Sequence, residues 1–147
     1  EIDGVCKGGL GKGELGVVIA PTGAGKSMVL VHLGAQAVKD GKVIVHYSME
    51  LSETVIGTRY DSCITGVPLN DVHSFKENIY ETVTALKGSL IIKEYPTKSA
   101  TTNTIKMHLE KLRNRGIEPD MIIVDYADLL RPICTRIKVS NLDSITN

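Results

Sequence analysis

The sequence predicts an α/β protein in which a mainly parallel β-sheet is flanked by helices, all within one domain that spans residues 1–147. Three observations predict this class. Strand-like and helix-like patterns alternate along the chain. The strand-like runs are short and almost wholly apolar, as expected of strands with both faces covered. A glycine-rich loop joins the first of these runs to the first helix.

The expected elements follow from apolar periodicity and from residues that begin or end helices. The expected strands are Leu15–Ala20, Val43–Ser48, Leu90–Tyr95 and Met121–Val124, and we expect the first to be buried on both faces. The expected helices are Ser27–Lys39, Glu53–Cys63, Phe75–Leu86 and Thr102–Arg115. Ser52 is expected to cap the second helix.

Composition limits the classes of protein that need to be considered. The chain is 42% hydrophobic and 23% charged, with a formal net charge of zero, which is typical of a globular domain. It contains no apolar run long enough to cross a membrane and opens on no signal-peptide pattern, so no membrane partner is expected. Three scattered cysteines (Cys6, Cys63 and Cys134) and four scattered histidines form no zinc-binding pattern and favour a reducing cytoplasm. We interpret the histidines as packing or surface residues.

The segment Ala20–Ser27 reads Ala-Pro-Thr-Gly-Ala-Gly-Lys-Ser and is typical of a phosphate-binding P-loop, although Ala20 stands where the pattern has glycine. Small residues let successive backbone N–H groups point at phosphate oxygens, and the helix that follows adds its positive end. Lys26 is expected to reach the β- and γ-phosphates, and the Ser27 hydroxyl to bind Mg²⁺. The residues expected to contact the nucleotide are Pro21, Thr22, Gly23, Ala24, Gly25, Lys26, Ser27 and Met28.

Two acidic residues follow predicted strands. Asp125 ends the apolar run that begins at Met121, where a carboxylate can bind the hydration shell of Mg²⁺ beside Ser27. Glu50 lies just past the second predicted strand, where a carboxylate can orient and deprotonate a water that attacks the γ-phosphate.

These motifs together resemble the motor domain of the DnaB-type replicative helicases, within the RecA-like ATPases, and particularly their phage-encoded relatives. The resemblance rests on the lead-in Gly8–Leu15, on the P-loop that begins with Ala20, on Ser48–Leu51 with the later Arg59, and on Asp125-Tyr126. It runs from about Gly8 to about Ile145. It implies a partial RecA-like ATPase core that is truncated before the last strands of its sheet.

The resemblance also implies roles. Lys26 and Ser27 would bind ATP and Mg²⁺, Glu50 would be the catalytic base, and Asp125 would hold the Mg²⁺ shell. Arg59 would be structural or would lie near the nucleotide. A polar sensor residue, an arginine finger and most DNA-contacting loops would lie beyond Asn147. The implied partners are single-stranded DNA, further copies of the chain in a hexameric ring, and a primase or helicase loader, in the host cytoplasm for a phage protein. The basic stretch Arg131–Lys138 is a further candidate contact to DNA or to a neighbouring subunit, and Leu142–Ile145 is expected to begin a helix.

Other tasks for the same core stay open. A RecA- or RadA-like recombinase, or another RecA-like remodelling ATPase, would use the same residues, although the segment from Ser48 to Arg59 favours the helicase. A nucleotide-gated assembly protein would bind ATP without turnover, which the presence of Glu50 disfavours. A small-molecule kinase is disfavoured because the arginines show no lid pattern, and a GTPase because the chain lacks an Asn-Lys-x-Asp motif.

Overall fold

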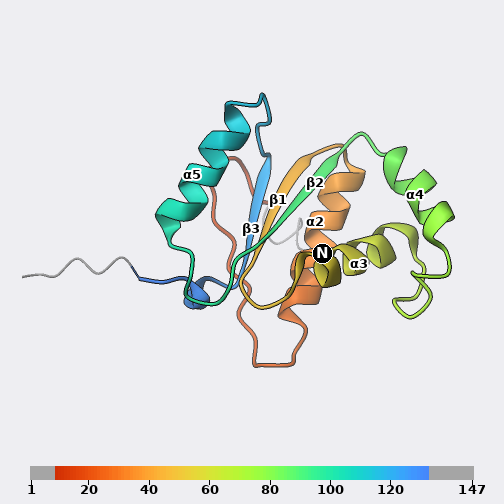
Figure 1. Cartoon of the computed structure of the whole chain (residues 1–147), viewed down its shortest axis with the longest axis horizontal. Helices are drawn as coiled ribbons and strands as arrows, with labels where there is room; N and C mark the ends of the chain where they lie inside the picture. Colours follow the sequence, from red (N-terminus) through yellow and green to blue (C-terminus); the bar gives the residue numbers. More distant parts are fainter. Residues whose placement is uncertain (1–8, 133–147) are drawn as a thin grey trace, which may run out of the picture.

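The computed structural model describes residues 9–132, and its helices and strands alternate along the chain (Figure 1). This alternation confirms the α/β class that the sequence predicts. In chain order the elements are α2 (Lys26–Lys39), β1 (Val43–Ser48), α3 (Glu53–Thr65), α4 (Lys76–Thr84), β2 (Ser89–Glu94), α5 (Thr102–Arg113), β3 (Met121–Asp125) and the short 3₁₀ helix η1 (Ala127–Leu129).

The sheet of the described residues has three parallel strands in the order β2–β1–β3, so β1 lies at its centre. Ser48, the last residue of β1, stands opposite Glu94 of β2 on one side and Asp125 of β3 on the other. All three strands therefore end at the same edge of the sheet. In an open α/β sheet this carboxyl edge is where ligands bind.

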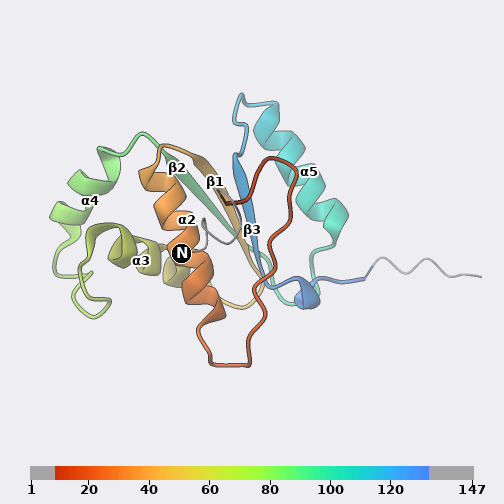
Figure 2. The same cartoon turned by 180° about the vertical axis from the view of Figure 1, so that it is seen from behind.

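The two faces of β1 belong to two separate hydrophobic clusters. Ile44 packs with buried side chains of α2 and α3, whereas Val45, Tyr47 and Met49 pack with Leu112 of α5. Helices α2 and α3 thus cover one face of the sheet and α5 covers the other, an arrangement visible from both sides (Figures 1 and 2). The near-continuous burial of β1 is expected of a central strand that is covered on both faces, and it includes the polar residues His46 and Ser48.

The helix boundaries have local chemical causes. The Ser52 hydroxyl accepts a hydrogen bond from the Val55 N–H at 3.3 Å, which confirms the predicted cap of α3. Thr101 and Thr104 form a reciprocal capping box at the start of α5. Gly66 ends α3 with a φ of 79°, a left-handed conformation that glycine adopts without steric cost. Helix α4 is shorter than predicted and covers Lys76–Thr84 rather than Phe75–Leu86.

The predicted first strand is wrong. Residues 15–20 pair with none of the strands in the described part of the chain, and Leu15 and Ile19 are 85% and 89% exposed rather than buried. The physical reason is that an apolar sequence favours burial but does not supply a neighbouring strand. Without a paired edge, the segment keeps its backbone hydrogen-bonding groups and its side chains toward solvent.

Several predictions concern residues outside the described range. The basic residues Arg136 and Lys138, the expected helix start at Leu142–Ile145, and Cys6 and Cys134 all lie there. Arg131 is described: it is exposed, and its N–H donates to the Ala100 carbonyl at 2.8 Å. Within residues 9–132, no helix combines the length and the apolar character that a bilayer crossing requires.

Candidate functional site

The glycine-rich loop forms a compact turn directly before α2. The Ala24 N–H donates to the Pro21 carbonyl at 3.2 Å, and Gly23 and Gly25 have φ values of 79° and 89°. These left-handed conformations are the ones that glycine adopts without a steric penalty. Gly25 precedes α2 without a side-chain cap, and the first turn of the helix carries no acidic residue. The first N–H groups of α2 therefore remain available to an anion.

Lys26 lies over this loop rather than pointing away from it. Its ammonium group donates to the carbonyl of Ala20 at 2.9 Å and to that of Pro21 at 3.2 Å. These bonds hold a positive charge at the loop, beside the half-buried Ser27. Thr22 and Met28 are exposed on either side. The predicted phosphate-binding residues are thus gathered at the start of one helix.

Asp125 is the last residue of β3 and is only 1% exposed. Its Oδ2 atom is buried and has no hydrogen-bond partner within residues 9–132. A buried carboxylate oxygen without a partner is costly, so this atom fits a hard cation such as Mg²⁺. The Met49 N–H also donates a hydrogen bond of 2.8 Å to the Asp125 carbonyl oxygen, so the turn after β1 is tied to the end of β3.

Glu50 lies in the turn that follows β1, and this turn is fixed by three hydrogen bonds. The Ser48 hydroxyl accepts from the Leu51 N–H at 3.0 Å and donates to the Leu51 carbonyl at 2.7 Å. The Thr97 hydroxyl donates to the Met49 carbonyl at 3.0 Å. The backbone at Glu50 is therefore held in place while its side chain is exposed. Sequence analysis missed Thr97, which lies beyond β2 and reaches this turn only through the fold.

These residues meet at one end of the molecule. The loop before α2, the turn after β1 and the end of β3 lie together at the lower end of the view in Figure 1. The parallel register explains this for Glu50 and Asp125, because both follow strands that end at the same edge. Arg59 is half-buried within α3, and no salt bridge is formed by it in the described part of the chain. Its role near the nucleotide stays a prediction.

No protein-only metal cage is formed by the described residues, among which no three His, Cys, Asp or Glu side chains gather. Magnesium does not need such a cage, because it is commonly bound by one or two protein oxygens together with substrate phosphates and waters. Ser27 and Asp125 could supply those protein oxygens.

A buried histidine–tyrosine pair lies behind Asp125 and was missed as a functional feature. His46 is fully buried at the centre of β1, and its Nδ1 atom lies 2.9 Å from the hydroxyl oxygen of Tyr60 on α3. Burial lowers the pKa of His46 from 6.5 to about 4, against the weaker opposite effect of the Asp125 charge. The ring is therefore neutral at pH 7. The sequence did offer one indication of this pair, because His46 is a polar residue within a largely apolar strand. We interpreted it as a packing residue.

A similar pair lies on the other face of β1. The Tyr47 hydroxyl oxygen is 2.8 Å from His108 Nδ1 on α5, and the Tyr47 ring stacks on Tyr95. Burial raises the pKa of Tyr47 to about 12, so its hydroxyl is protonated at neutral pH. This pair lies on the face opposite Asp125 and has no place in the candidate site.

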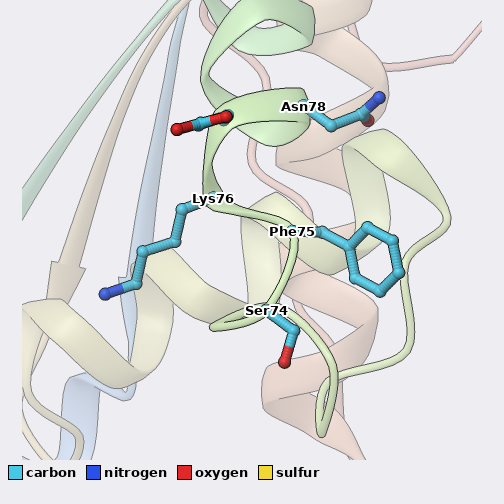
Figure 3. Close-up of a pocket in the computed structure, with 5 residues that line it drawn as sticks. Ser74, Phe75, Lys76 and Asn78 are labelled. Atoms are coloured by element: carbon cyan, nitrogen blue, oxygen red, sulfur yellow. The ribbon is translucent and has the colours of Figure 1, made fainter.

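The hollow at the start of α4 is not part of the site. Ser74, Phe75, Lys76, Glu77 and Asn78 line it, and all five are exposed. Figure 3 shows Phe75 and Lys76 pointing in opposite directions, so the labelled side chains do not converge on one point. Such an arrangement lacks the convergent polar groups of a ligand pocket.

The fold and the candidate site together define a class of protein. A glycine-rich loop that opens a helix beside acidic residues at the carboxyl edge of a parallel sheet is typical of α/β proteins of the P-loop type.

Comparison with known proteins narrows this class, and the chain belongs to the family of the DnaB-like helicase C-terminal domain, which matches residues 1–147. This membership confirms the predicted family and its RecA-like α/β fold. The chain is 32% identical over 151 residues to the "DnaB-like replicative helicase" of Enterobacteria phage T4, an alignment that covers 97% of this chain and 31% of that protein. It is 23% identical over 127 residues to the "Replicative DNA helicase DnaB" of Helicobacter pylori, with 83% of this chain and 26% of that protein covered. The chain thus spans less than a third of the length of these relatives.

Proposed function

We propose that this chain is the ATP-hydrolysing motor core of a DnaB-like replicative DNA helicase. The observation that carries the proposal is the buried Oδ2 atom of Asp125, which has no hydrogen-bond partner among residues 9–132. Asp125 lies at the same end of the molecule as the loop before α2. That loop carries Lys26, and it leads into the first backbone N–H groups of α2, which have no side-chain cap. A cation at Asp125 and a phosphate at the loop would satisfy both sets of groups.

Each residue of the site has a role in this proposal. Lys26 would exchange the carbonyls of Ala20 and Pro21 for phosphate oxygens. Ser27 and Asp125 would hold Mg²⁺, which when bound neutralises charge on the phosphates. Glu50, whose backbone is fixed and whose side chain is exposed, would orient the attacking water and accept its proton. Arg59 would lie near the nucleotide by family resemblance alone.

The task of the whole protein is proposed from its relatives. Both are named as replicative helicases, so we propose single-stranded DNA as the track, a hexameric ring as the assembly, and a primase or a helicase loader as a further partner. A neutral net charge is compatible with a ring that carries its basic groups on the inner face. We propose a cytoplasmic location, within the host cell for a phage protein.

ATP hydrolysis by the complete gene product, with and without single-stranded DNA, tests the proposal. We expect DNA to stimulate turnover. Lys26→Ala should abolish nucleotide binding, because the ammonium is the phosphate-binding charge. Glu50→Gln should lower kcat by about 10²- to 10⁴-fold while nucleotide still binds, because it removes only the base. Glu81→Gln, an exposed carboxylate on α4, is the matched control and should leave turnover unchanged.

The alternative functions predict other results. Turnover indifferent to DNA would contradict a helicase and favour a remodelling ATPase. Tight ATP binding without turnover would favour a nucleotide-gated assembly protein. If DNA does stimulate turnover, unwinding of a forked duplex separates a helicase from a recombinase.

A further inference from the structure

Two buried side-chain atoms without a hydrogen-bond partner lie on the same side of the sheet. Within residues 9–132 they are His46 Nε2 and Asp125 Oδ2. His46 stands opposite Ile123 in the register of β1 and β3, and Asp125 is two residues further along β3. Side chains two residues apart on a strand share a face, so His46 and Asp125 are diagonal neighbours. Both face the layer formed by α2 and α3.

The two atoms are also chemically complementary. His46 is neutral, so one ring nitrogen carries a proton and the other does not. Tyr60 can donate its hydroxyl proton to Nδ1, which leaves the ring proton on Nε2. The negative charge of Asp125 favours this tautomer, because it places a donor rather than a lone pair on the free nitrogen. Nε2 is then a donor without an acceptor, beside a carboxylate oxygen without a donor.

We propose that His46, held by Tyr60, is a positioning residue that orients the Asp125 carboxylate through its Nε2–H group and one bridging water. The water would take one lone pair of Oδ2 and leave the other to the cation. The proposed link is a water because no direct hydrogen bond joins the two atoms and neither has another partner within residues 9–132. The inference concerns residues behind the metal site, and its relevance to Mg²⁺ rests on the proposed function. Partners of this kind fix the orientation of a metal-binding carboxylate.

Tyr60 also touches the helix that carries Ser27. A Cβ atom added at Gly34 of α2 would clash with the Tyr60 hydroxyl oxygen, so this oxygen packs directly against the helix backbone. Tyr60 therefore packs on α2, the helix whose second residue is Ser27, while His46 stands diagonally across from Asp125 on β3. Loss of the pair should change how well Asp125 and Ser27 hold one cation together.

A Mg²⁺ titration of nucleotide binding by the protein tests the positioning role. His46→Leu keeps a similar volume but removes the donor, and Tyr60→Phe removes the group that sets the tautomer. We expect both to raise the Mg²⁺ concentration for half-maximal binding of a fluorescent ATP analogue by about 10-fold. His46→Gln, which retains an N–H donor, should recover part of this loss.

Tyr47→Phe is the matched control. It removes the equivalent tyrosine–histidine hydrogen bond on the opposite face of the same strand. We expect its Mg²⁺ dependence to equal that of the wild type. An equal shift in Tyr47→Phe, or no shift in His46→Leu and Tyr60→Phe, would show that the His46–Tyr60 pair serves packing alone and would overturn the proposal.

A second measurement needs neither nucleotide nor turnover. Selective ¹⁵N labelling of histidine reports the tautomer of His46 by NMR, with His46→Gln identifying its signals among the four histidines. We expect the proton on Nε2, and we expect Asp125→Asn to shift this signal. A proton on Nδ1, or no response to Asp125→Asn, would contradict the link. If the wild type binds no Mg²⁺–nucleotide, the proposed function fails, and the NMR result alone decides whether His46 orients Asp125.

Discussion

His46 is the residue at which burial and charge oppose each other most directly. Its pKa is about 4 in the folded chain and 6.5 when exposed, so the unfolded chain binds a proton that the folded chain excludes. The His46 contribution leaves the free energy of unfolding unchanged above pH 6.5 and lowers it as the pH drops from 6.5 toward 4. We expect the free energy of unfolding to be about 2 kcal/mol lower at pH 5 than at pH 7.5 from this residue alone. Urea unfolding at the two pH values measures the difference.

His46→Leu provides the control for this pH dependence. Burial and the neighbouring Lys93, Lys111 and Arg115 also lower the pKa of His108, so this second histidine contributes a loss of the same sign. The variant should therefore lose less stability at pH 5 than the wild type does, while part of the acid sensitivity remains. Identical pH dependence in wild type and variant would mean that His46 is not held neutral by burial.

At the scale of the elements, α2 packs so closely on its neighbours that Gly34 has no room for a side chain. An added Cβ would clash with the Tyr60 hydroxyl oxygen and would meet Ile123 Cδ1 at 3.0 Å, and both residues lie in the core. Gly34→Ala must therefore shift α2 or displace Tyr60. We expect this substitution to lower the free energy of unfolding by about 1–3 kcal/mol, as overpacking of a core does, measured by urea unfolding.

Gly57 on α3 offers a matched control for the Gly34 substitution. It is also a glycine inside a helix, but an added Cβ would meet only Ile92 Cδ1, at 3.8 Å. Gly57→Ala should instead raise the free energy of unfolding by about 0.5–1 kcal/mol, because alanine loses less conformational entropy in a helix. Changes of the same sign at both positions would contradict the close packing of α2 on Tyr60.

The elements also show which features a sequence can predict. The cap at Ser52 and the positions of Glu50 and Asp125 at strand ends could be predicted because they depend on local rules: a cap before a helix, or an acid where a strand ends at the shared edge. The bond between His46 and Tyr60 joins β1 to α3 and depends on how closely these elements pack. No local pattern encodes that distance. The predicted strand at residues 15–20 was wrong for a related reason, because strand pairing requires a neighbouring strand that the segment's own residues do not specify.

At the scale of the whole molecule, the described residues form three layers: α2 with α3, the sheet, and α5. These layers leave the apolar segment 15–19 uncovered. Leu15, Val17 and Ile19 are 85%, 70% and 89% exposed, and the segment that contains them leads directly into the loop at Ala20. The rest of the candidate site is held by the sheet: Asp125 ends β3, and the turn at Glu50 is bonded to Leu51 and Thr97. The site thus combines two firmly held acidic residues with a phosphate loop whose incoming chain is not anchored in the sheet of the described residues.

This difference in anchoring predicts the pattern of amide exchange in the isolated 147-residue chain. The amides of residues 15–19 make no ladder with the sheet, so they should exchange with deuterium at close to the rate of an unstructured peptide. The amides of β1, hydrogen-bonded between β2 and β3, should exchange only through global unfolding and provide the internal reference. Hydrogen exchange followed by mass spectrometry or NMR measures both segments in one sample. Protection of residues 15–19 equal to that of β1 would mean that this segment pairs as a strand after all, and the phosphate loop would then be anchored from both ends.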